Sequence, residues 1–405
     1  MKIRYDRDFV KYWLASIISS AGSRLTYVAM PVLVFDLTGS PFLTGLVVAF
    51  EAMAYVLVGL LAGTVADRVD RKRLLVGGDL VNAVALGSVP VAAALDALTV
   101  GHVFVVVAVS GVATVFFDAA NFASLPMLVG RERMAAAYSV LYGPLTVVGI
   151  VAPGLAGLLL ATMTPAGVLA VDAVSFLASA VLLRAIGRAM SRERDATTRR
   201  SLFAEAREGL VFLWNHPTIR PMTIMSFAQS ASGGAALGQF VPVAHNLFGP
   251  ARAAWSASVM FLAFSVGGLI STVVYPRLRK RVAAGRVALA STPIAAILAL
   301  LCGLPSSLVP LAVLIAAWAT IYTTNASNSI VFRQSETPEP LLSRVNAAGR
   351  MLAWGVGTPA GAFVSGLVAS AWGPRWAFAV AASFGVLATA LAWLSPLRSQ
   401  PQPAH

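Results

Sequence analysis

Twelve apolar stretches, each long enough to cross a lipid bilayer, restrict the fold of this chain more than any other feature. A membrane-spanning helix needs about 20 predominantly apolar residues. Only 12% of the residues are charged, whereas soluble domains contain about a quarter. The sequence therefore predicts an all-α polytopic membrane protein. The predicted spans cover about 10–35, 42–66, 74–95, 102–126, 135–160, 166–187, 220–248, 255–276, 286–304, 308–332, 345–370 and 376–395.

Lysine and arginine are distributed unevenly among the connections between these spans. The two termini and every second connection hold 27 of the 30 basic residues, whereas the other connections hold only Arg252 and Arg375. Cytoplasmic loops are the ones enriched in Lys and Arg, so both termini are predicted to be cytoplasmic. The net charge of +13 then follows from topology, and no nucleic-acid partner is expected.

The longest connection divides the chain near its middle. It predicts a six-helix bundle at 1–187, a cytoplasmic linker at 188–218 and a second six-helix bundle at 219–398. Within the linker, "SLFAEAREGLVFLW" has apolar residues at helical spacing, which favours a helix lying in the cytoplasmic interface. The alternative is a cytoplasmic extension of the seventh span. Two pseudo-symmetric helical halves around a central site are typical of transporters.

Few residues suit catalysis or metal binding. Cys302 is the only cysteine, and the four histidines are scattered without ligand spacing. No nucleotide-binding loop of the G-x-x-x-x-G-K-[ST] type occurs, and no motif joins a nucleophile to a base. The sequence therefore predicts a protein that is not an enzyme, has no metal or other cofactor, and draws its energy from a proton gradient.

The connection between the second and third spans carries the most specific motif, "GTVADRVDRKRLL". It resembles the loop signature of the major facilitator superfamily, with an Asp where the usual glycine follows Asp-Arg-x. That form is similar to the exporter branch that contains macrolide efflux pumps and the enterobactin exporter. "GSRLTYVAMPVLVFDLTGSP", "FDAANFASLPMLV" and "SLFAEAREGLVFLWNHPTIR" also resemble that branch, although its usual Pro and Arg are Ala119 and Asn121 here. The motif residues are Gly63, Asp67, Arg68, Asp70, Arg71 and Lys72.

The resemblance implies that this motif acts as a conformational latch. Asp67 would meet the positive N-terminal end of the eleventh span, near 344–349, when the cytoplasmic side is closed. Gly63, one turn earlier, would let two helices approach closely. The alternative is an ordinary positive loop with an incidental acid.

A second motif lies in the fifth span and is similar to the superfamily's antiporter motif, with the order of Gly and Pro altered. Its glycines permit close helix contact, and its proline bends the helix by removing a backbone hydrogen bond. Such a helix suits a rocking interface, although ordinary packing is an equal alternative. The motif residues are Gly149, Pro153, Gly154 and Gly157.

Acidic residues inside the bilayer are costly and therefore indicate function. Both acids beyond the linker, Glu336 and Glu339, fall in a predicted cytoplasmic loop, so proton coupling must use the first half. Glu51 and Arg24 lie at similar distances from the turn that joins the first two spans, and we expect them at similar depth. They are candidates for proton coupling or for a static ion pair. Asp118 is a third candidate, or an anion that holds Arg68 and Arg71.

The resemblance places the first, fourth, seventh and tenth spans around the substrate cavity. These spans carry aromatic and neutral amide side chains, a set that suits an amphipathic compound. Polar residues also hold membrane helices together, and that alternative covers about half of the set. The cavity candidates are Tyr27, Gln229, Gln239, Trp318, Tyr322, Asn325 and Asn328.

The sequence thus predicts a monomeric secondary transporter in the bacterial cytoplasmic membrane. We expect it to export an amphipathic small molecule, such as a drug, an antibiotic or a siderophore-like compound, by proton antiport. The alternatives are an importer of a nutrient or siderophore, a lysophospholipid flippase and, from a different class, a non-transporting sensor.

Overall fold

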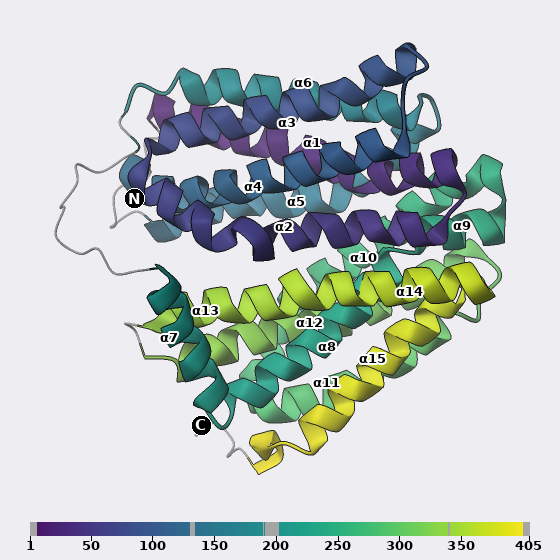
Figure 1. Cartoon of the computed structure of the whole chain (residues 1–405). Coiled ribbons are helices and arrows are strands. Elements are labelled where there is room, and N and C mark those ends of the chain that lie inside the picture. Colours follow the sequence, from purple (N-terminus) through teal and green to yellow (C-terminus); the bar gives the residue numbers. More distant parts are fainter. Residues whose placement is uncertain (1–5, 130–133, 189, 191–201, 339–340, 400–405) are drawn as a thin grey trace. The chain divides into compact units, whose positions relative to one another are not determined.

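The computed structural model describes residues 6–129, 134–188, 190, 202–338 and 341–399. Every regular element in these ranges is helical, and eleven of the helices within them are long and apolar enough to cross a membrane. The prediction of an all-α polytopic membrane protein is therefore confirmed. Figure 1 shows the succession of helices along the chain.

The chain divides into two compact units that do not follow a single cut in the sequence. The first unit contains Met1–Leu33 and Ala54–Arg199, and the second contains Val34–Met53 and Arg200–His405. The end of the first helix and the start of the second therefore belong with the second unit.

The first six helices coincide with the first six predicted spans. In the first unit, α3 packs against both α4 and α6 (Figure 1). In the hydrophobic core of this unit, Phe9 and Tyr12 of α1 pack together with Leu75 of α3 and with Leu183 and Ile186 at the end of α6. The helices are α1 (Arg7–Thr38), α2 (Pro41–Arg68), α3 (Arg71–Ala94), α4 (Val100–Val129), α5 (Met134–Leu160) and α6 (Pro165–Arg184).

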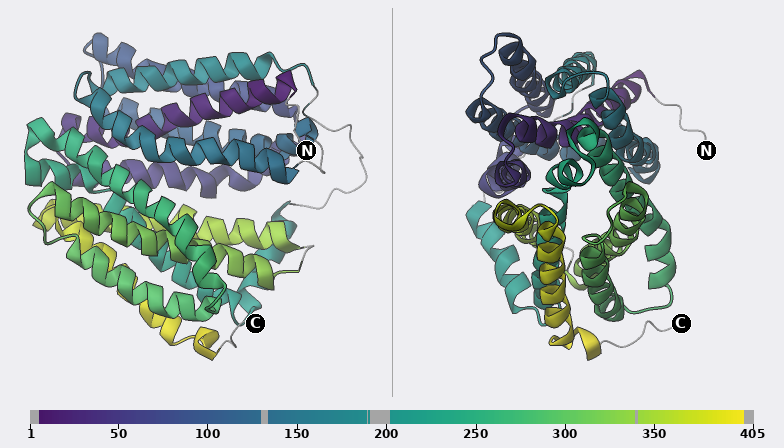
Figure 2. Two further views of the ribbon diagram at one scale, coloured as in Figure 1. Left: turned by 180° about the vertical axis from the view of Figure 1, so that it is seen from behind. Right: turned by 90° about the vertical axis from the view of Figure 1, so that its right-hand side faces the viewer.

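The second unit contains the remaining helices. Helix α12 packs against α10 and α11, and α15 packs against α8 and α11. Figure 2 shows these helices, coloured from teal to yellow, from two further sides. They are α7 (Leu202–Asn215), α8 (Ile219–Leu237), α9 (Phe240–Phe248), α10 (Pro250–Arg279), α11 (Ala284–Leu301), α12 (Leu308–Glu336), α13 (Leu342–Arg350), α14 (Thr358–Trp372) and α15 (Trp376–Trp393).

Two of the predicted spans are interrupted. The predicted span 220–248 forms α8 and α9, which are separated at Gly238 and Gln239. Helix α8 is not among the eleven apolar helices because its buried faces carry Ser, Thr and Gln side chains. The predicted span 345–370 contains a π-helical turn, Met351–Gly357, between α13 and α14, and such turns occur often at functional sites.

Glycine permits a very close contact between α8 and α14. A Cβ atom at Gly361 would overlap the carbonyl oxygen of Ala231 and lie 2.7 Å from its Cα. A Cβ at Gly357 would lie 2.6 Å from the carbonyl oxygen of Phe227. Only glycine fits where two helix backbones approach this closely, so these glycines fix the position of α14 against α8.

The predicted linker helix is present as α7. It packs against α13, where Leu213 is buried with Ile219, Val345 and Ala348. Arg344 forms an ion pair of 2.5 Å with Glu208. The first turn of α13 is therefore held by α7 within the second unit. Residues 191–201 of the predicted linker lie outside the described residues.

Candidate functional site

Three of the cavity candidates lie on one face of α12. Trp318, Tyr322 and Asn325 follow one another at spacings of four and three residues, which places them on the same side of a helix. The rings of Trp318 and Tyr322 are 5.3 Å apart, and Phe264 of α10 contacts both at 5.7 and 5.9 Å. Gln229 of α8 donates a hydrogen bond of 2.6 Å to the carbonyl oxygen of Tyr322. These five residues form a polar-aromatic cluster.

The cluster contains buried polar atoms that have no partner among the described residues. The indole nitrogen of Trp318, both amide atoms of Asn325 and the side-chain oxygen of Gln229 all lack a hydrogen bond. Most buried polar groups in proteins are hydrogen-bonded, so each exception needs an explanation. Donors and acceptors beside aromatic rings are suited to binding an amphipathic molecule that supplies the missing hydrogen bonds.

Two other cavity candidates hold helices together instead. Asn328 donates a hydrogen bond of 2.9 Å to the carbonyl oxygen of Ala284, at the start of α11. Gln239 donates one of 2.9 Å to the carbonyl oxygen of Pro41. The structural alternative therefore accounts for the amide nitrogens of these two, whereas their side-chain oxygens have no hydrogen bond among the described residues. Tyr27 lies on α1 in the first unit, whereas the other six candidates lie in the second.

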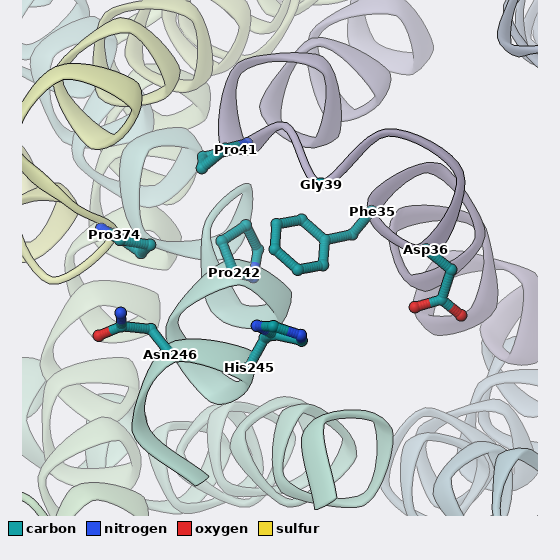
Figure 3. Close-up of a pocket in the computed structure, with 8 residues that line it drawn as sticks. All are labelled: Phe35, Asp36, Gly39, Pro41, Pro242, His245, Asn246 and Pro374. Carbon is teal, nitrogen blue, oxygen red and sulfur yellow. The ribbon is translucent and has the colours of Figure 1, made fainter. Parts of the chain in front are cut away.

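The second unit also has an open pocket of about 620 Å³. Figure 3 shows the ring of Phe35, from the end of α1, beside Pro242 and His245 of α9, with Asp36 on one side of them and Asn246 on the other. The rings of Phe35 and His245 meet edge to face, with centroids 5.0 Å apart. Gly39, Pro41, Pro242 and Pro374 complete the lining. A carboxylate, an imidazole and an amide beside apolar rings give this pocket both charged and apolar contacts.

Sequence reasoning did not identify this pocket as a site. Its polar groups come from positions far apart in the chain: Asp36, His245 and Asn246. The sequence indicates only that helices end near Gly39 and Gly249, because glycine is frequent in turns. Both glycines have a positive φ in the structure, +61° and +78°. Such signals mark the ends of helices, and they do not show which ends meet.

In the loop motif between α2 and α3, the structure shows hydrogen bonds of Asp70 and Lys72. Asp70 is the N-cap of α3, and its side chain accepts a hydrogen bond of 2.9 Å from the backbone of Arg73. Lys72 donates to the carbonyl oxygen of Ile186 at 2.6 Å. Arg68 is exposed at the end of α2, and Arg71 is partly buried. Gly63 and Asp67 lie in α2, but their surroundings fall outside the described residues, so the latch stays a prediction.

The proton-coupling candidates are not brought together within one unit. Arg24 is exposed on α1 in the first unit, whereas Glu51 is half-buried on α2 in the second. Their predicted pairing stays a prediction. Asp118 of α4 accepts a hydrogen bond of 2.5 Å from the hydroxyl of Tyr55.

Gly149 of the antiporter-like motif in α5 is less closely packed against described residues than the glycines at the contact between α8 and α14. Among the described residues, a Cβ at Gly149 would meet no atom within 4 Å, and the close helix contact expected of this motif stays a prediction. Pro153 is buried in the interior of α5, and Gly154 and Gly157 follow in the same helix. The motif's role in a rocking motion stays a prediction.

The chain matches the family described as "Transmembrane secretion effector" over residues 5–403. It belongs to this family. The family is a branch of the major facilitator superfamily, so the predicted superfamily membership is confirmed. A member of this family is a transporter and not an enzyme.

Similar proteins agree with this assignment. The "Multidrug efflux pump Tap" of Mycolicibacterium fortuitum is 28% identical over 89% of this chain and 88% of its own length. The "Macrolide efflux protein A" of Streptococcus pyogenes is 23% identical over 51% of each chain. As a member of this family, the present chain is a multi-pass bacterial membrane protein.

Solved structures establish the fold. The nucleoside transporter NupG superposes with a TM-score of 0.75 at 17% identity, covering 95% of this chain and 97% of that one. A bacterial homologue of the lysosomal transporter Spinster, in an inward-facing state, gives a TM-score of 0.71 at 15% identity, covering 98% of each chain. These likenesses show that the secretion effector has the major facilitator fold. They carry no information on its substrate.

Proposed function

We propose that this protein exports amphipathic small molecules across the bacterial cytoplasmic membrane by proton antiport. Both termini are cytoplasmic in this proposal, and the two six-helix bundles alternate in exposing the substrate site. The protein acts as a monomer in the lipid bilayer. The efflux-pump names of the similar proteins support the direction of transport.

One observation carries the proposal: the polar-aromatic cluster of α8, α10 and α12 holds unpartnered donors and acceptors but no ionised group. Trp318 and Asn325 are buried without hydrogen bonds. A substrate with a flat apolar part and a few polar atoms would pack against the rings and pair with these groups. A multiply charged substrate would lose more hydration than these neutral groups replace, whereas a single delocalised charge, as in ethidium, can lie against the aromatic rings.

Direction and coupling are tested together in inside-out membrane vesicles, with the fluorescent organic cation ethidium as the probe. An imposed pH gradient, acidic inside, is expected to drive ethidium accumulation, and an uncoupler is expected to abolish it. Accumulation in right-side-out vesicles instead would indicate an importer. Ethidium transport that does not depend on the pH gradient would favour a flippase. The absence of transport of any probe would favour a sensor.

Glu51 is our first candidate for the coupling carboxylate. Glutamine matches its shape but cannot release a proton, so Glu51→Gln is expected to lower gradient-driven ethidium uptake at least tenfold while leaving the folded protein intact. The matched control is Glu336→Gln, which changes an exposed acid at the end of α12. Intact gradient-driven uptake in Glu51→Gln would exclude Glu51 from coupling.

The pocket beside Asp36 gives a further prediction about cationic substrates. A carboxylate at a pocket mouth raises the local concentration of cations. Asp36→Asn is therefore expected to weaken ethidium binding several-fold, with a smaller effect on a neutral macrolide such as erythromycin. Titration of both probes with purified protein, at low and high salt, measures the difference. Equal effects on the two probes would contradict an electrostatic role for Asp36.

A further inference from the structure

Arg333 is an arginine buried at the end of α12. It lies in the last turn of that helix and is only 3% exposed. Its Nε atom donates a hydrogen bond of 3.0 Å to the side-chain oxygen of Asn346 on α13. No ion pair of Arg333 occurs in the described part of the chain. A buried charge without an opposite charge is costly, so this guanidinium needs an explanation.

The guanidinium lies against the backbone of α13, which contacts α12 (Figure 1). A Cβ atom at Gly349 would overlap the Nη1 and Cζ atoms of Arg333 and lie 2.8 Å from its Nε atom. The missing side chain of this glycine therefore leaves the space in which the guanidinium lies. Because Asn346 occupies the Nε atom, the N–H groups of both terminal nitrogens remain available to another acceptor.

The face of α13 that meets Arg333 offers a further donor and a second positive charge. Arginine only donates, so the hydrogen bond to Asn346 uses the amide oxygen and leaves the amide nitrogen as a donor. Arg350 lies four residues after Asn346, on the same face of the helix, and it is exposed. Two guanidinium groups and an amide nitrogen thus present donors at one helix contact.

The described acids of the neighbouring segments do not neutralise these donors. Glu208 of α7 is paired with Arg344 at 2.5 Å. Glu336 is exposed at the end of α12 and forms no ion pair with a described residue. Glu339 lies outside the described residues. The described part of the contact between α12 and α13 is therefore positively charged.

A phosphate group matches this set of donors. Guanidinium binds phosphate oxygens through two parallel N–H···O bonds, and such charge-assisted hydrogen bonds are stronger than neutral ones. The contact lies at the end of α12 that the distribution of Lys and Arg predicts to be cytoplasmic. Basic pockets between membrane helices on that side bind lipid head groups, and free phosphate is the soluble source of the same chemistry.

We propose that Arg333, Asn346 and Arg350 bind a phosphate group at the contact between α12 and α13. The terminal nitrogens of Arg333 and the amide nitrogen of Asn346 donate to its oxygens, and Arg350 adds a positive charge at the exposed rim. Gly349 positions the guanidinium by leaving room for it. The site lies within the second unit, and it does not depend on the proposed proton antiport.

Thermal unfolding of the purified protein in detergent tests the site, because a ligand that binds the folded state raises the unfolding temperature. Inorganic phosphate and dihexanoyl phosphatidylglycerol are titrated separately, with sodium chloride at matched ionic strength as the reference. The wild type is expected to gain several degrees. A gain with both probes shows that the phosphate group itself is recognised. A gain with the lipid alone identifies a head-group site, and a gain with inorganic phosphate alone identifies a site for the soluble anion.

Three variants locate the binding. Arg333→Gln removes the buried charge and is expected to weaken the apparent affinity at least tenfold, whereas Arg350→Gln is expected to weaken it several-fold. Gly349→Ala keeps both charges, and its added carbon displaces only the flexible end of a side chain. It is therefore expected to fold normally and to bind at least fivefold more weakly. The matched control is Arg277→Gln, which changes an exposed arginine in the last turn of α10 and is expected to stay within twofold.

Two results would overturn the inference: a wild type that phosphate and the lipid stabilise no more than sodium chloride does, or wild-type affinity in both Arg350→Gln and Gly349→Ala. If Arg333→Gln fails to fold, these two variants still decide the question, because neither removes the buried side chain. Absence of transport would overturn the proposed function and leave this site unaffected, since unfolding reports binding without any transport.

Discussion

Replacing Gly361 by valine is expected to prevent the second unit from folding normally. The first side-chain carbon would overlap the carbonyl oxygen of Ala231, so α14 would have to move away from α8 and lose its packing there. Overpacking in a well-packed interior usually costs about 1–3 kcal/mol, and an overlap of a side-chain carbon with a neighbouring helix backbone lies at or beyond the upper end. We expect a fall in the thermal unfolding temperature and aggregation on size-exclusion chromatography in detergent.

Gly149→Val is the matched control, because it also adds an isopropyl group to a glycine inside a predicted span. A Cβ at Gly149 would meet no atom within 4 Å, so this variant is expected to unfold within a few degrees of the wild type. Equal destabilisation by the two substitutions would contradict the close approach of α8 and α14.

The spans, the linker helix and the cap of α3 can be predicted from the sequence, because each depends on residues that are close together in the chain. Helix length and apolarity locate the spans, because the bilayer sets the required length directly. The linker helix α7 was predicted in the same way, from apolar residues at helical spacing. Asp70 could also have been recognised as an N-cap, because an Asp directly before a helix is a frequent capping residue.

The arrangement of side chains around the site depends on packing that no local pattern encodes. Asn325 and Asn328 are equivalent in the sequence, yet one is unpartnered and the other binds the carbonyl oxygen of Ala284. Asp36 and His245 line the same pocket although they are more than two hundred positions apart in the sequence.

The contrast between the two asparagines of α12 gives the sharpest test of the substrate site. Asn325→Leu is expected to lower gradient-driven ethidium uptake at least tenfold, because leucine cannot pair with a polar substrate atom. The same substitution is expected to stabilise the folded protein by about 1 kcal/mol, since it removes a buried amide that has no hydrogen bond. A gain in stability with a loss of function is typical of a residue kept for binding.

Asn328→Leu, three residues along the same helix, is expected to behave in the opposite way. It removes the hydrogen bond from its side-chain nitrogen to the carbonyl oxygen of Ala284, and the net loss for one such hydrogen bond is about 0.5–1.5 kcal/mol. Ethidium affinity is expected to change little in the fraction that folds. Thermal unfolding and ethidium titration of the two variants, side by side, measure both effects. If Asn325→Leu transports as well as the wild type, the amide of Asn325 is not part of the substrate site, and the polar-aromatic cluster serves only to pack α12 against α8 and α10.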